Sequence, residues 1–252
     1  MKVAAPTVAP ARVALIPGGA KGIGQRIAVD LARRGWSVAV AYRTSRDAAE
    51  ETVRQIAAAG GKGRAMAADV SVPAECERLV RTVTDWQGRV DALVNCAGPF
   101  HRVDLFSETP EGWREMFANN LDCLFYLARL VAPGMIERQW GRIIAFSMSN
   151  ADRLVAQPQL TAHYLAKVSV LGLVRTLSKA LARHRVTVNA ISPGFIDSGS
   201  MGEEELKAMS RNIPAGYVGS TADASSLALY LLSDEAAYVT GANIPVSGGW
   251  GW

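Results

Sequence analysis

The chain has 252 residues, of which 49% are hydrophobic, and its formal net charge is +4 at pH 7. This length and apolar content suffice for one α/β domain with a substantial core. Charged residues of both signs are interspersed without a long basic block, so the sequence lacks the footprint of a nucleic-acid-binding protein, and we expect no nucleic-acid partner.

The cysteines and the N-terminal residues bear on localisation. Cys76, Cys96 and Cys123 cannot all pair and show no C-x-x-C spacing, which favours reduced thiols, a cytoplasmic location and no metal site. Residues 1–11 contain alanines and prolines without a continuous apolar run, so we predict a flexible tail and no signal peptide. No apolar stretch approaches the roughly 18 residues of a membrane span, so we expect no membrane association.

Apolar and amphipathic segments alternate along the first half of the chain. A buried strand over 12–16 is followed by a glycine-rich turn and a helix that ends near Gly35. The next predicted elements are a strand over 37–42, a helix over 45–61, a strand over 62–70, a helix over 73–88 and a strand over 90–98.

The alternation continues to the C-terminus. The predicted elements are a long helix over about 111–138, a strand over 141–148, a helix near 160–183, a strand over 187–194, a polar helix around 202–211, a helix near 221–233 and a last strand around 242–249. Such alternation indicates βαβ units, which build a parallel sheet covered on both faces. No linker or repeat interrupts it, so we predict a single α/β domain over 12–252, a Rossmann-type doubly wound parallel sheet.

The turn after the first strand reads GGAKGIG and contains Gly18, Lys21, Gly22, Ile23 and Gly24. Glycine is needed where the backbone turns sharply and where a pyrophosphate approaches main-chain N–H groups at a helix N-terminus. Three glycines alone would be a weak signal. Their position between a strand and a helix is the context that a dinucleotide-binding turn requires.

The end of the second strand indicates which dinucleotide binds. An acidic residue there would bind the ribose 2′-hydroxyl of NAD and repel a 2′-phosphate. This chain has Arg43, Thr44 and Ser45 instead, and Lys21 adds a positive charge from the glycine turn. Because a guanidinium can hold a phosphate through two parallel hydrogen bonds, we predict NADP(H) in preference to NAD(H). The alternative for Arg43 is a solvated surface arginine.

Further motifs follow in a characteristic order. They are DV at 69–70, NCAG at 95–98, NNL at 119–121, GRII at 141–144, VNAISPG at 188–194 and VSGG at 246–249. With the glycine turn, they make the chain resemble the short-chain dehydrogenase/reductase family, in its ketoacyl-carrier-protein-reductase-like group, from about residue 11 to the end. The resemblance implies hydride transfer between a nicotinamide and a carbonyl or alcohol carbon.

The resemblance also implies cofactor contacts. Asp69 and Val70 would flank the adenine, although Asp69 is equally well explained as a turn residue. The positions implied beneath the ribose are Asn95, Ala97 and Gly98, and those implied at the nicotinamide are Pro193, Gly194 and Ile196.

In the family, a tyrosine hydroxyl delivers a proton, a lysine lowers the pKa of that tyrosine, and a serine polarises the substrate oxygen. Asn120 matches a helix asparagine that holds a water in a relay to this lysine, and Asn119 is the fallback if the register slips. Lys167 matches the lysine, which also binds the cofactor ribose in the family.

The stretch TAHYLAK departs from this pattern. His163 stands four residues before Lys167, where the family has tyrosine, and Tyr164 stands three before it. On a helix, His163 and Tyr164 would lie roughly 40° and 60° to either side of Lys167. An imidazole, with an unperturbed pKa of about 6.5, can also donate a proton. The proton donor is therefore His163, Tyr164 or neither side chain.

The serine is displaced as well. Its family position holds Met148, and of the flanking Ser147 and Ser149 we favour Ser147 because it lies closer to the rigid strand. The loop that follows is about two residues longer than the commonest family form, so Asn150 or Asp152 could enter the site or serve as turn residues.

Residues 196–219 correspond to the segment that closes over substrate in the family, and their glycines and mixed polarity predict a lid. The helices over 111–138 and 160–183 form subunit interfaces in the family. Trp250 and Trp252 are costly to expose, so we expect them to pack against a neighbouring subunit of a homotetramer or homodimer, or to cover the pocket of their own chain.

We predict NADPH-dependent reduction of a carbonyl, imine or activated double bond in a small molecule or acyl thioester, with an atypical proton donor. The alternative is a non-catalytic NADP(H)-binding regulatory or scaffold protein on the same fold.

Overall fold

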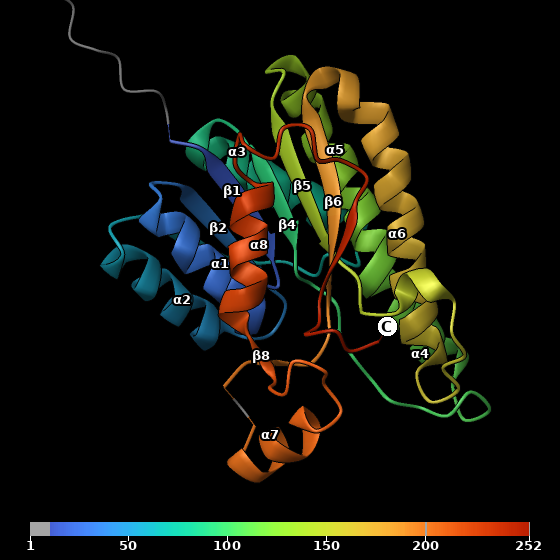
Figure 1. Ribbon diagram of the computed structural model, residues 1–252. Coiled ribbons are helices and arrows are strands. Elements are labelled where there is room, and N and C mark those ends of the chain that lie inside the picture. The colour runs from blue at the N-terminus through green and yellow to red at the C-terminus, as the bar shows by residue number, and fades with distance from the viewer. Residues whose placement is uncertain (1–10, 200, 252) are drawn as a thin grey trace, which may run out of the picture.

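The computed structural model describes residues 11–199 and 201–251, and these form one α/β domain around a seven-stranded parallel sheet (Figure 1). The strand order is β3-β2-β1-β4-β5-β6-β9. The strands are β1 (Val13–Pro17), β2 (Ser37–Tyr42), β3 (Lys62–Ala67), β4 (Ala92–Asn95), β5 (Gly141–Phe146), β6 (Val186–Pro193) and β9 (Asn243–Val246). The chain runs outward from β1 to β3 and then crosses to β4, which confirms the predicted doubly wound sheet.

Two layers of helices cover the sheet (Figure 1). One layer contains α3 (Pro73–Gln87), α5 (Cys123–Glu137) and α6 (Thr161–Leu181), and the other contains α1 (Gly22–Arg33), α2 (Arg46–Ala58) and α8 (Thr221–Leu231). Val13 and Leu15 of β1 pack with the first layer, and Ala14 and Ile16 pack with the second. Because both faces are buried, the strand is apolar throughout.

The predicted long helix over 111–138 is interrupted. It consists of α4 (Pro110–Phe117), a π-helical turn (Ala118–Asp122) and α5. The side-chain amides of Asn119 and Asn120 each donate to a carbonyl four residues earlier, Glu115 and Met116, at 3.0 Å. In a regular α-helix those carbonyls would accept backbone N–H groups, so the two asparagines favour the wider turn.

Four strands, β3, β4, β5 and β9, are shorter than predicted. β3 ends at Ala67, and the Asp69 side chain then accepts a hydrogen bond from the Ser71 N–H at 3.0 Å, which closes a turn. β4 comprises only Ala92–Asn95.

The remaining elements lie outside the main sheet. β7 (Ile196–Asp197) and β8 (Gly219–Ser220) pair with each other, and α7 (Glu203–Ser210) stands between them in the chain (Figure 1). Over the described residues, no helix has the length and apolar character needed to cross a bilayer. The predicted tail over 1–11 lies, except for residue 11, outside the described residues, as does Trp252.

The buried carboxylate of Asp91 ties the two halves of the sheet together. Asp91 precedes β4, and its side chain accepts hydrogen bonds from the Val13 N–H at 2.9 Å and from Arg89 Nε at 2.8 Å. Arg138, which follows α5, adds an ion pair at 3.4 Å. A charge can be buried only where it is paired and hydrogen-bonded, and Asp91 meets both conditions.

We predict that Asp91→Ala lowers the free energy of unfolding by about 3 kcal/mol, because the Val13 N–H and both arginines lose their shared acceptor. Urea denaturation followed by circular dichroism measures the change. Asp85→Ala, at an exposed position of α3, is the control and should alter the free energy of unfolding by less than about 0.5 kcal/mol. Equal stability of the two variants would contradict the prediction.

Candidate active site

The glycine turn packs directly against the residue that follows β4. Gly18 has φ +74°, and a methyl group on its Cα would lie 2.6 Å from the Cys96 carbonyl oxygen. A methyl group on Gly24 would lie 2.5 Å from the Gly18 carbonyl oxygen. Both positions therefore require glycine, and the main chain of the turn stays open to close approach by a ligand at the start of α1.

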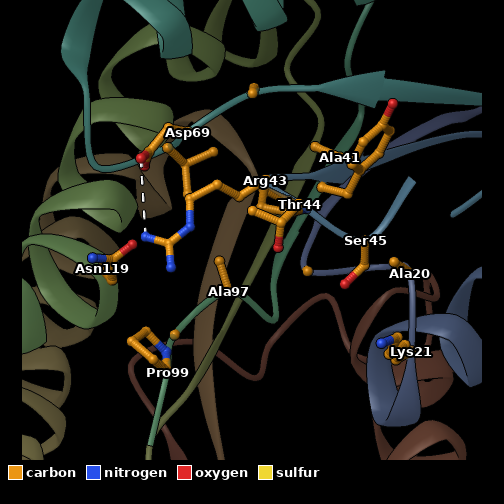
Figure 2. Close-up of a pocket in the computed structure, with 16 residues that line it drawn as sticks. Ala20, Lys21, Ala41, Arg43, Thr44, Ser45, Asp69, Ala97, Pro99 and Asn119 are labelled. Carbon is orange, nitrogen blue, oxygen red and sulfur yellow. Dashed lines mark ion pairs between the residues drawn. The ribbon is translucent and has the colours of Figure 1, made fainter. Parts of the chain in front are cut away.

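Two adjoining cavities follow this turn and share Gly18, Lys21 and Gly98. The other predicted cofactor residues that line the first cavity are Arg43, Thr44, Ser45, Asp69, Val70 and Ala97 (Figure 2). Those that line the second are Ile23, Gly24, Pro193 and Ile196. The fold thus gathers these side chains from the ends of several parallel strands at one edge of the sheet, where α/β folds bind ligands.

Four predicted cofactor residues do not line these two cavities, namely Gly22, Asn95, Gly194 and Lys167. Gly22 is the first residue of α1, and Asn95 is buried at the end of β4 with its Nδ2 directed to Cys123 Sγ at 3.4 Å. Gly194 packs against Ser247, and a methyl group on Gly194 would lie 2.8 Å from the Ser247 Cβ. Gly22, Asn95 and Gly194 therefore shape the backbone around the cavities and do not line them.

Asp69 is both a turn residue and a cavity residue. Its Oδ1 accepts from the Ser71 N–H and hydroxyl, and its Oδ2 lies 3.9 Å from Nη1 of Arg43. The same guanidinium nitrogen lies 3.8 Å from a carboxylate oxygen of Glu115 on α4. The sequence carried no signal for Glu115, because nothing in its spacing connects it with the second strand.

Lys167 is buried beside Gly98, which lines both cavities. Its Nζ donates to the carbonyl of Phe146, at the end of β5, at 2.8 Å. Burial lowers the pKa of Lys167 to about 8. A methyl group on Gly98 would lie 3.5 Å from Nζ and would collide with Oδ1 of Asn120. Lys167 and Asn120 therefore converge on Gly98.

Asn120 lies in the π-helical turn with its side chain buried. Its Nδ2 donates to the carbonyls of Met116 at 3.0 Å and Pro99 at 3.2 Å. Its Oδ1 has no hydrogen-bond partner among the described residues. A buried acceptor beside a lysine is a suitable place for an ordered water, which agrees with the relay that the resemblance implies.

His163 is buried near the start of α6. Its ring meets Phe100 edge-on, with the ring centroids 5.1 Å apart. Burial, followed by the charge of Lys167, lowers the pKa of His163 to about 4, so the imidazole is neutral at pH 7. Within the described part of the chain, Nδ1 of His163 has no hydrogen-bond partner.

Tyr164 has a different environment. Its hydroxyl donates to the Asn150 carbonyl at 3.0 Å and accepts from the Val155 N–H at 2.8 Å. Both bonds hold the loop after β5, in which Asn150 and Leu154 have φ values of 69° and 54°. The phenol is therefore engaged in shaping the loop.

The candidate serines are engaged with main-chain groups. Ser147 donates to the Lys167 carbonyl at 2.8 Å, and Ser149 donates to the Ser192 carbonyl at 3.3 Å. Met148 is partly buried and packs against the apolar core between the sheet and the layer of α3, α5 and α6. Asp152 accepts from Asn243 Nδ2 at 3.3 Å. In the described part of the chain, no group of three His, Cys, Asp or Glu residues is placed to hold a metal ion.

Comparison with known proteins identifies the family. The family described as enoyl-(acyl carrier protein) reductase matches residues 18–251. The chain belongs to the short-chain dehydrogenase/reductase family.

Curated relatives of this family align along nearly their whole length. The 3-oxoacyl-(acyl-carrier-protein) reductase of Staphylococcus epidermidis is 34% identical over 239 residues, which cover 94% of this chain and 97% of that protein. The acetoacetyl-CoA reductase of Allochromatium vinosum is 36% identical over 244 residues, covering 95% and 98%. Both relatives are named as reductases.

Solved structures of the short-chain dehydrogenase/reductase family agree. The acetoin dehydrogenase of Salmonella typhimurium has a TM-score of 0.87 at 29% identity and covers 95% of this chain and 96% of its own. That of Enterobacter cloacae has a TM-score of 0.89 at 29% identity, covering 96% of both chains. The likeness therefore extends over the whole domain.

The C-terminal tryptophan that the structure describes packs within its own chain. Trp250 meets Phe195 with ring centroids 4.6 Å apart. The predicted lid over 196–219 contains β7 and α7, and its closure stays a prediction. The expected homotetramer or homodimer also stays a prediction; α5 and α6 expose Phe125 and Leu165.

We predict that Tyr164→Phe lowers the free energy of unfolding by about 1–2 kcal/mol, because the Val155 N–H loses its acceptor in a part-buried loop. Thermal unfolding measures the loss. Tyr238→Phe, which removes the hydroxyl of a fully exposed tyrosine, is the matched control and should have no measurable effect. If Tyr164→Phe were as stable as the control, the two bonds would not support the loop.

Proposed function

We propose that this protein is an NADP(H)-dependent oxidoreductase that transfers a hydride to a carbonyl carbon, or to an imine or activated double bond, of a small molecule or acyl thioester. The observation that carries the proposal is the convergence of Lys167 and Asn120 on Gly98, where the two cavities meet. A protein that only binds a dinucleotide does not need a buried ammonium group and an unpartnered amide oxygen at that point. The relatives' names, which refer to 3-oxoacyl, acetoacetyl and acetoin compounds, support a carbonyl substrate.

The residues around the first cavity fit a dinucleotide. Gly18 and Gly24 let the turn fold tightly at the start of α1, because a Cβ on either would collide with a main-chain carbonyl, and Lys21 and Arg43 supply positive charge for phosphates. When bound, such a cofactor supplies the hydride. The residues that we propose to hold it are Gly18, Lys21, Gly22, Ile23, Gly24, Arg43, Thr44, Ser45, Asp69, Val70, Asn95, Ala97, Gly98, Lys167, Pro193, Gly194 and Ile196.

We predict that the protein binds NADPH at least about tenfold more tightly than NADH, a difference of about 1.4 kcal/mol. Arg43→Ala should weaken NADPH binding much more than NADH binding, because only NADPH carries the 2′-phosphate. Fluorescence titration measures both dissociation constants. Arg54→Ala, which removes an arginine from the exposed side of α2, is the control. Equal affinities of the unmodified protein for the two cofactors would refute the preference.

For the proton transfer, we propose His163 as the donor to the substrate oxygen and Lys167 as the group that protonates His163. Because the imidazole is neutral at pH 7, the ammonium of Lys167 first passes its proton to His163, and the imidazolium so formed gives that proton to the substrate oxygen as the carbon is reduced. The alternatives are less well supported. The Tyr164 hydroxyl is engaged with the loop, and Ser147 and Ser149 donate to main-chain carbonyls.

This pairing has a defined pH dependence. The pKa of Lys167 is lowered to about 8 and that of His163 to about 4, so the pair holds one proton between these two values. The microstate with the proton on His163 is a fixed fraction of that one-proton state. Activity should therefore be constant at neutral pH and fall as the pH rises through about 8, where the pair loses its proton.

We predict that His163→Ala lowers kcat by about 10²- to 10⁴-fold while leaving the NADPH dissociation constant unchanged. Tyr164→Phe should retain most of the wild-type kcat. Steady-state rates of NADPH oxidation between pH 5 and 10 provide the measurement. If the two variants exchanged behaviour, and activity persisted above pH 9, the donor would be Tyr164. If both kept wild-type rates, neither side chain would be the proton source.

A second candidate is a non-catalytic NADP(H)-binding regulatory or scaffold protein. The observation in its favour is that both candidate serine hydroxyls are donated to main-chain carbonyls. A panel of ketones, ketoacyl thioesters, quinones and cyclic imines separates the candidates. NADPH binding without oxidation across that panel would favour the second.

A further inference from the structure

The guanidinium of Arg43 lines the first cavity and lies near two carboxylates. Nη1 lies 3.9 Å from Oδ2 of Asp69 and 3.8 Å from Oε1 of Glu115. Figure 2 shows Arg43 extended toward Asp69 and Asn119, whereas Ser45 and Lys21 lie on the opposite side of the cavity. The guanidinium that we propose to bind a 2′-phosphate therefore lies near two carboxylates, of which Asp69 lines the cavity and Glu115 does not.

The two carboxylates are not equivalent. Asp69 is committed to its own turn, because Oδ1 accepts two hydrogen bonds from Ser71. Glu115 belongs to α4, which follows β4 in the chain. Among the described residues, Arg43 is the only ion-pair partner of its carboxylate. Its side chain is 52% exposed, so its attraction for Arg43 is screened and a doubly charged phosphate can displace it.

We propose that Glu115 tunes cofactor selection by competing with the 2′-phosphate of NADP(H) for Arg43. The proposal rests on the use of Arg43 for that phosphate. Binding NADPH requires the guanidinium to exchange the Glu115 carboxylate for the phosphate, whereas NADH leaves the ion pair intact. Glu115 therefore weakens NADPH binding selectively and narrows the preference that Arg43 provides.

The test is a double-mutant cycle on Glu115 and Arg43, read by fluorescence titration of NADPH and NADH at low ionic strength. Glu115→Gln should tighten NADPH binding by about threefold, the effect expected for an exposed ion pair, and leave NADH binding unchanged. In the Arg43→Ala background the same change should have no effect. Raising the salt concentration should shrink the gain, because exposed charges are screened.

Glu111→Gln is the matched control. Glu111 lies on the same helix and pairs with Arg114 at 3.4 Å, so its substitution removes the same charge without touching Arg43. A gain equal to that of the control, a gain that persists without Arg43, or an equal gain for NADH would overturn the proposal. If Arg43→Ala alone left NADPH binding unchanged, the assignment of Arg43 to the phosphate would fail instead, which is a separate result.

Discussion

Burying the ammonium group of Lys167 is the constraint on which the site depends. A charged amine loses hydration free energy in the protein interior, and the loss must be offset by polar groups at fixed positions. Phe146, at the end of β5, supplies one with its carbonyl, and the hydroxyl of Ser147, which follows that strand, donates to the Lys167 carbonyl. The same burial lowers the pKa of Lys167 to about 8, which brings its proton into the range where it can be exchanged near neutral pH.

The π-helical turn places a second polar side chain near the buried ammonium group. The turn carries Asn120 toward Gly98, and only a residue without a side chain leaves room there for Oδ1. Gly98 in turn lines both cavities. The irregular helix, the buried lysine and the glycine are thus three parts of one arrangement, and substituting any of them would disturb the other two.

The fold could be predicted because its signals are local and repeated. Apolar strands such as 13–17 and the glycines of the first turn act within a few residues, and the sheet order follows from alternation with helices. The break in the helix over 111–138 could not be predicted. It depends on where two asparagine side chains point, and the helical pattern of the flanking residues is unaffected.

The candidate site shows the same division. Most of the predicted cofactor residues line the two cavities, because the order of the motifs indicates which strand ends meet, and their roles stay predictions. The contacts of Arg43 with Glu115 and of Tyr164 with Val155 could not be predicted from the sequence. Each joins groups whose separation is set by packing, and a main-chain N–H such as that of Val155 has no residue-type signature.

The Tyr164 hydroxyl links the start of α6 to the loop after β5. That loop has left-handed residues at Asn150 and Leu154, and the hydroxyl anchors it through two hydrogen bonds. A phenol used in this way is withdrawn from proton transfer. His163, one residue earlier on α6, lies beside Phe100, and its Nδ1 has no hydrogen-bond partner among the described residues. In the proposed mechanism, the role of Lys167 differs from the one that a tyrosine donor implies. A phenol needs a nearby cation to lower its pKa, whereas an imidazole whose pKa burial lowers to about 4 needs a group that supplies its proton, and Lys167, with a pKa of about 8, is the group we propose.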